Sequence, residues 1–199
     1  MKTSVIGTEF RNRYLSNPKH PNVFIAKAVV FEGPEDYHKR LNNKKLKIDE
    51  NSILIIRGCG PVGYPGSAEV INMQPPDRLL KKGINTLPTL GDGRQSGTSA
   101  SPSILHVSPE SAVGGDLGIV KTGDKIKIDL NKRRVDLLIS KSEFKNRRKK
   151  RKKFKINNQT PWQEIFRDTV GQLEDGACIK SRGIYLKVST SKGIPRDSH

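Results

Sequence analysis

The sequence predicts an α+β domain built mainly on a β-barrel or sandwich, with short helices at its edges. Many short runs of β-branched and aromatic residues, separated by turns, predict the strands, and a few capping motifs predict the helices. At 199 residues the chain suits one domain with its own core. We expect an entry segment (residues 1–22), a β-rich domain that carries two unusual loops (23–140), and C-terminal helices with a last strand and tail (141–199).

The first half of the chain alternates apolar runs with turn signals. Val23–Phe31 and Ser52–Arg57 are predicted strands, and the second is apolar enough to be buried on both faces. Between them, Gly33-Pro34 opens a short helix, because proline fits the first helical position. A further strand is expected in Ile84–Leu90, and Ser108-Pro109-Glu110 is interpreted as the cap and first turn of another helix.

The second half begins with three predicted antiparallel strands, Leu117–Val120, Lys125–Leu130 and Arg134–Ser140. Capping boxes at Ser140-x-x-Glu143 and Thr160-Pro161-x-Gln163 then predict two helices.

Behind the second box, apolar residues recur at helical spacing, which favours a core-facing stripe over a cofactor site. The stripe consists of Trp162, Ile165, Phe166, Val170 and Leu173. A last strand is expected at Ile184–Val188.

Two glycine-rich loops are the most informative stretches of the chain. Arg57–Glu69 holds four glycines and two prolines, so its backbone follows a path that few side chains would tolerate. Ser67 is expected to cap a helix that starts at Ala68, which places Glu69 in its first turn. The Glu69 carboxylate then either faces the helix dipole or binds a divalent cation as a hard oxygen ligand.

The second loop, Gly91–Thr98, places an acid, a cation and two hydroxyls between three glycines. A serine hydroxyl in such a loop can bond a substrate, or act as a base where a nearby cation stabilises its alkoxide. On composition alone an ordinary surface turn is the commoner interpretation.

The charge of the chain is strongly positive, with a formal net charge of +17. Nine cations and no acid lie in Lys145–Lys155, where Phe154 is the single aromatic residue. Such a run can bind phosphate backbones, but it also suits a solvated helix face or a linker. Nucleic acid is therefore the rival interpretation and not the expected partner.

The cysteine content and the hydropathy of the chain limit which classes of protein it can belong to. Cys59 and Cys178 lie far apart and form no metal-ligand spacing, so we expect thiols instead of a disulfide. No apolar run approaches the roughly 20 residues of a membrane span. Met1–Asn12 has no signal pattern, and we expect a cytoplasmic protein without membrane partners.

Several segments together resemble one protein family. They are Arg57–Gly66 with Ala68–Val70, Gly91–Thr98, Ser103–Glu110 with Gly114-Gly115, and in the tail Thr160–Glu164, Gly171–Leu173 and Gly193–Arg196. In this order they closely resemble the C-terminal domain of the dihydroxy-acid dehydratase/phosphogluconate dehydratase family, in its sugar-acid (arabinonate/xylonate) branch. Lys145–Asn158 departs from that family's pattern.

This resemblance implies a swivelling-type β-barrel with flanking helices, and a hydro-lyase that converts an aldonate to a 2-keto-3-deoxy acid. It implies an iron–sulfur cluster that acts as a Lewis acid and a Mg²⁺ ion that holds the carboxylate end of the substrate. By the same resemblance Ser96 is the catalytic base, Glu69 a Mg²⁺ ligand, and Thr98 and Arg94 contacts to substrate oxygens. Asp92 and Tyr64 are expected to shape the loops.

The family's cluster cysteines and other Mg²⁺ ligands belong to a larger N-terminal domain that lies outside these 199 residues. The expected partners are therefore that domain, a sugar-acid substrate and further copies in a homo-oligomer, and we expect no dehydratase activity from this chain alone. Two alternatives stay open: a non-catalytic basic domain that binds nucleic acid or a partner through Lys145–Lys155, and a stand-alone relative that binds a sugar acid.

Overall fold

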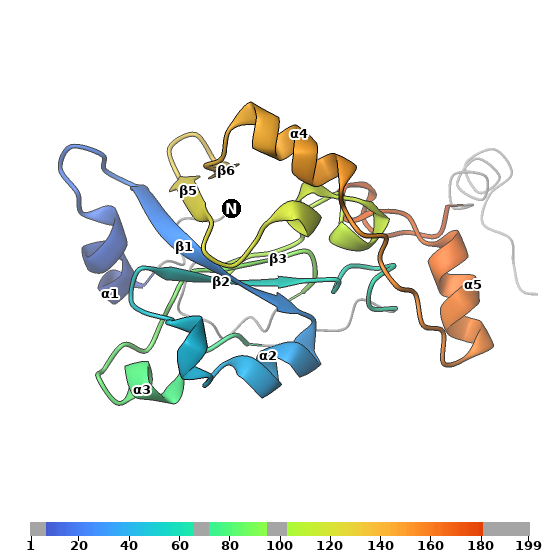
Figure 1. Ribbon diagram of the computed structural model, residues 1–199, viewed down its shortest axis with the longest axis horizontal. Coiled ribbons are helices and arrows are strands. Elements are labelled where there is room, and N and C mark those ends of the chain that lie inside the picture. Colours follow the sequence, from blue (N-terminus) through green and yellow to red (C-terminus); the bar gives the residue numbers. More distant parts are fainter. Residues whose placement is uncertain (1–6, 66–71, 95–102, 181–199) are drawn as a thin grey trace, which may run out of the picture.

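The computed structural model describes residues 7–65, 72–94 and 103–180 and folds them around one mixed sheet with short helices about it (Figure 1). The six strands run in the order β4-β3-β2-β1-β5-β6 and curl into a half-barrel. They are β1 Val23–Glu32, β2 Ser52–Arg57, β3 Thr89–Gly91, β4 Ser103–Ile104, β5 Lys125–Asp129 and β6 Arg134–Leu137. The α+β class is confirmed, whereas the described residues do not show a closed barrel.

The helical elements are short. The α-helices are α1 Thr8–Phe10, α2 Pro34–Arg40, α3 Asp77–Leu80, α4 Lys141–Lys149 and α5 Pro161–Thr169. A π-turn, η2 Arg11–Leu15, continues α1, and the 3₁₀ turns are η3 Lys44–Leu46, η4 Ser111–Val113, η5 Asp116–Ile119 and η6 Leu173–Asp175. At the two predicted capping boxes the N-cap bond is confirmed, since the Ser140 side chain accepts from the Glu143 N–H and the Thr160 side chain from the Gln163 N–H.

Strand β2 lies at the centre of the molecule. Its residues from Ser52 to Ile56 are all buried, as predicted for a strand covered on both faces. Ile53 and Ile55 join one apolar cluster, and Leu54 and Ile56 join a second cluster on the opposite face.

Strands β1, β2, β3 and β4 are parallel, so their carboxyl ends meet at one edge of the sheet. There Glu32 is paired with Arg57, and Ile56 with Gly91. The strands β5 and β6 extend the sheet beyond β1, and their predicted antiparallel pairing with each other is confirmed.

Three local predictions are wrong. Leu117–Val120 forms the turn η5 instead of a strand, because its carbonyls turn toward the guanidinium of Arg57. Glu110 precedes η4 instead of entering a first helical turn, and its side chain is fully buried. The strand expected in Ile84–Leu90 begins only at Thr89.

The apolar stripe on α5 is also not core in the part of the chain that the structure describes. Trp162 is 78% exposed and Ile165 52%, whereas Val170, just after the helix, is buried. Helix α5 instead packs through Arg167, whose Nε donates to the Val62 carbonyl at 2.8 Å. The last predicted strand, Ile184–Val188, lies outside the described residues.

Candidate functional site

Both glycine loops leave the same edge of the sheet from neighbouring strands. The first follows β2 and is described through residue 65, and the second follows β3 and is described through residue 94. Because β2 and β3 are parallel and in direct register, the loops start side by side.

The side chain of Asp92 connects the two loops. It is fully buried, and its carboxylate accepts from the backbone N–H groups of Gly58 at 3.1 Å and Cys59 at 2.9 Å. It also accepts the N–H of Ser111 at 2.8 Å. A Cβ at Gly93 would lie 2.4 Å from the Cys59 carbonyl oxygen, so only glycine allows this approach of the two loops. The prediction that Asp92 shapes the loops is confirmed.

Glu110 holds the far end of the first loop. Its carboxylate is fully buried and accepts from the backbone N–H groups of Val62 at 2.9 Å and Gly63 at 2.8 Å. The side-chain amide of Gln172 donates to the same carboxylate at 2.8 Å, and its oxygen accepts the Glu110 N–H at 3.0 Å. A Cβ at Gly60 would lie 2.4 Å from Glu110 Oε2. Glu110 thus occupies the space that the glycine leaves open.

Two arginines bind carbonyl groups around the first loop. At its root, Arg57 pairs with Glu32 and donates to the carbonyl oxygens of Leu117, Gly118 and Val120 at 2.9–3.2 Å. Near its middle, Arg167 binds the Val62 carbonyl. The loop is therefore held by carboxylates at its N–H groups and by guanidinium groups on or beside it, which are strong, charge-assisted hydrogen bonds.

The residues predicted to carry the chemistry are only partly within the described chain. Arg94 is described and exposed, just beyond the contact between Gly93 and the first loop. Glu69, Ser96 and Thr98 lie outside the described residues. Tyr64 is half-buried, and its N–H donates to the Gly60 carbonyl at 2.8 Å.

Sequence reasoning missed Glu110, Gln172 and Arg167 as parts of this site. Gln172 and Arg167 are more than 100 residues away from the loop that they support. Gln172 lies in the segment Gly171–Leu173 that resembles the dehydratase family, but nothing in that segment indicated a contact with the loop, and no local pattern marks Arg167. Glu110 belongs to a segment that resembles the dehydratase family, but its proline neighbour suggested a helix start.

Neither cysteine belongs to a candidate metal site in the part of the chain that the structure describes. Cys59 is buried, and burial raises the pKa of its thiol well above the ordinary value, with the nearby carboxylate of Asp92 adding to the effect. A buried, protonated thiol is an unreactive nucleophile. Across residues 7–65, 72–94 and 103–180, no group of three or more His, Cys, Asp or Glu side chains could hold a metal ion.

In that same part of the chain, no helix has the length and apolar character needed to cross a membrane.

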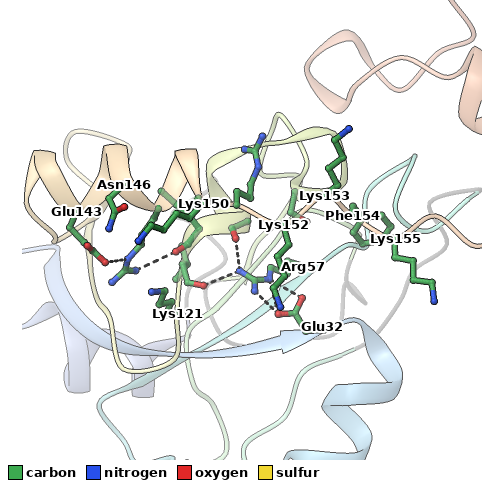
Figure 2. A pocket seen from close by; sticks show the side chains of 16 residues that line it. Glu32, Arg57, Lys121, Glu143, Asn146, Lys150, Lys152, Lys153, Phe154 and Lys155 are labelled. Carbon is green, nitrogen blue, oxygen red and sulfur yellow. Dashed lines mark hydrogen bonds and ion pairs between the residues drawn. The ribbon is translucent and has the colours of Figure 1, made fainter.

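A basic groove lies beside the root of the first loop, between α4, η5 and the segment 150–155 (Figure 2). Its volume is about 610 Å³. The ring of Phe154 lies against Gly58, where an added Cβ would be 2.8 Å from Cε2 of the ring. The basic segment is thus in direct contact with the first loop.

The fold and the loops define an α+β half-barrel domain with one paired-loop site at the carboxyl edge of its parallel strands. Residues 14–177 match the family described as the dihydroxy-acid/6-phosphogluconate dehydratase C-terminal domain, and the chain belongs to this family.

Among its relatives is the D-xylonate dehydratase of Caulobacter vibrioides, which is 54% identical over the whole chain and 33% of its own length. The L-arabinonate dehydratase of Rhizobium leguminosarum is 39% identical over 90% of the chain and 30% of its own length. A dihydroxy-acid dehydratase of Thermodesulfovibrio yellowstonii is 38% identical over 77% of the chain and 27% of its own length. The chain thus spans about a third of the length of these relatives.

Proposed function

We propose that the chain is the C-terminal domain of a sugar-acid dehydratase that converts an aldonate to a 2-keto-3-deoxy acid. The observation that carries this proposal is the joining of the two loops by Asp92, which accepts the N–H groups of Gly58 and Cys59. The names of the two sugar-acid relatives, D-xylonate and L-arabinonate dehydratase, support the substrate class.

In this proposal Ser96 removes the proton from C2 of the substrate, and the electron pair of that bond forms the C2=C3 double bond. The C3–O bond breaks and the hydroxyl takes up a proton and leaves as water. The resulting enol gains a proton at C3 and becomes the 2-keto acid. Arg94 and Thr98 hold substrate oxygens.

The proposal includes Mg²⁺, for which Glu69 offers a carboxylate oxygen of the kind that this ion prefers. A bound divalent cation would neutralise the charge that grows on the substrate carboxylate as the C2 proton leaves. The thiol of Cys59 does not fit an iron–sulfur cluster, because it is buried, donates to the Arg57 carbonyl oxygen at 3.7 Å, and belongs to no group of three or more metal-binding side chains among the described residues. We therefore assign the cluster to the N-terminal domain and derive no step through it.

The proposed partners follow from the same family. The relatives are about three times as long as the chain, so we propose an N-terminal dehydratase domain as the direct partner, within a cytoplasmic homo-oligomer.

The test is a chimaera in which this chain replaces the matching third of the Caulobacter D-xylonate dehydratase. We expect it to form the 2-keto-3-deoxy acid from D-xylonate. Ser96→Ala should lower kcat by about 10²- to 10⁴-fold, the usual contribution of a general base. Ser142→Ala, on the exposed face of α4, is the matched control and should leave kcat within twofold of the parent. If Ser96→Ala keeps the activity of the control, the proposed base is wrong.

A further inference from the structure

The basic groove carries more positive charge than its own carboxylates balance. Eight cationic side chains and two carboxylates, Glu32 and Glu143, line it. Those carboxylates already pair with Arg57 and Arg147, and Arg147 pairs with Asp124 as well. Within the part of the chain that the structure describes, none of the five lining lysines lies within 4.0 Å of a carboxylate oxygen. They are Lys121, Lys150, Lys152, Lys153 and Lys155.

The lysines come from separate elements that converge on one cavity. Lys121 lies in the turn before β5, Lys150 at the end of α4, and Lys152 in the segment that follows. Figure 2 shows Lys152 directed toward the ion pair of Arg57 with Glu32, whereas Lys153 and Lys155 extend outward at the rim. The groove floor is partly apolar, from Ile119, Val120 and Phe154.

We propose that this groove binds a small molecule that carries a short chain of phosphates. Lysine ammonium groups bind phosphate oxygens as point charges, and several of them in one cavity favour a multiply charged anion over a single carboxylate. The volume of about 610 Å³ suits a small ligand.

A nucleic-acid strand fits the groove less well. Binding of single strands without sequence preference relies on aromatic side chains that stack on successive bases. Phe154 is the single aromatic side chain in the lining, and its ring rests on Gly58.

The site is positioned to act on the first loop. Arg57 is both the root of that loop and part of the groove, and Phe154 contacts Gly58 from the segment that carries Lys152 and Lys153. A ligand that draws these lysines together holds the segment against the loop and restrains the amides of Gly58 and Cys59. This inference does not depend on the dehydratase activity, because it concerns binding to the 199-residue chain itself.

The experiment is calorimetric titration of the 199-residue chain with inorganic tripolyphosphate, with orthophosphate for comparison. We expect one saturable site for tripolyphosphate and much weaker binding of orthophosphate. The combined Lys121→Gln, Lys150→Gln and Lys152→Gln variant should raise the Kd about tenfold or more, since each exposed charge contact is worth a few-fold. These lysines are exposed, so the variant is expected to fold.

The matched control neutralises Lys19, Lys44 and Lys45, which are exposed and lie away from the groove lining, and should change the Kd less than twofold. A second readout is the amide NMR signal of Gly58, which should shift on titration in the parent and the control but not in the groove variant. The inference is overturned if both variants lose binding equally or if tripolyphosphate binds without saturation. It is also overturned if a single-stranded oligonucleotide binds these lysines and tripolyphosphate fails to displace it.

Discussion

Replacing Glu110 by Gln should destabilise the first loop more than any surface change of the same kind. The Glu110 carboxylate accepts three hydrogen bonds, from the N–H groups of Val62 and Gly63 and from the Gln172 amide, at 2.8–2.9 Å. The substituted side chain has the same shape, but an NH₂ group takes the place of one oxygen.

The magnitude follows from that exchange. At least one buried N–H group loses its acceptor and faces a donor instead, and the remaining bonds lose the charge of the carboxylate. Hydrogen bonds to charged groups contribute about 1.5–3 kcal/mol each, and an unsatisfied buried donor costs about 1–3 kcal/mol. We therefore expect Glu110→Gln to lower the free energy of unfolding by about 2–4 kcal/mol. A domain of this size has roughly 5–15 kcal/mol of stability, so the variant should still fold.

Two measurements check this prediction, urea denaturation for the total effect and amide hydrogen exchange for its location. The amides of Val62 and Gly63 should lose protection, whereas that of Cys59, which Asp92 holds, should keep most of it. Glu50→Gln, at an exposed turn, is the matched control and should change stability by less than about 0.5 kcal/mol. Equal stability of the two variants, with unchanged exchange at Val62 and Gly63, would refute the role assigned to Glu110.

Three further predictions follow from charged and titratable groups. Arg147→Met removes the partner of the Asp124 carboxylate, whose side chain is 10% exposed, and should lower the free energy of unfolding in urea by about 3 kcal/mol. Arg148→Met, at a side chain that is 57% exposed, should lower it by less than about 1 kcal/mol. Equal losses in the two variants would contradict the role assigned to the pair of Arg147 with Asp124. In the native chain at pH 8, a thiol-specific reagent should leave Cys59 unmodified until denaturant is added, because burial raises its pKa; rapid native labelling of Cys59 would show that the loop opens. Asp36→Asn should lower stability by up to about 1 kcal/mol at pH 7. Arg40 holds the pKa of Asp36 below its ordinary 3.8. The stability difference between the native chain and Asp36→Asn should therefore persist down to about pH 4 and vanish as the pH falls through the folded-state pKa of Asp36. A constant stability difference down to pH 2 would contradict this prediction.

The sheet could be predicted where a strand shows its environment in its own composition. Ile53–Ile56 is uniformly apolar because both faces of β2 are covered, and Lys125–Asp129 alternates because one face is wet. The bounds of β1 and β2 agree with the prediction to within one residue. Leu117–Val120 was misassigned because short apolar runs occur in buried turns as well as in strands. What decides between them is the distant guanidinium of Arg57, which binds the carbonyls of this turn.

The prediction that the apolar stripe on α5 is buried was wrong for a different reason. Periodic apolar residues predict a buried face only where another element covers that face, and within the described chain nothing covers Trp162 or Ile165. The chain spans about a third of the length of these relatives, and a face of this kind is buried only where a further element packs on it. The same argument explains why the sequence located the two loops but not their complete surroundings.

The candidate site was predictable as a pair of loops because glycine and proline mark an irregular backbone, but the groups that hold the backbone were not. A loop that is bare of side chains offers its own N–H and C=O groups as its main points of attachment, and buried groups of this kind need partners. The structure meets this need with carboxylates at the N–H groups, from Asp92 and Glu110, and with the guanidinium group of Arg167 at the Val62 carbonyl. Arg57, at the root of the loop, ties the loop to the carbonyls of η5. Because these side chains come from β2, the second loop, the turn before η4 and helix α5, the loop conformation is imposed by the whole fold. A change in any one of those elements should therefore alter the first loop even when the loop sequence stays the same.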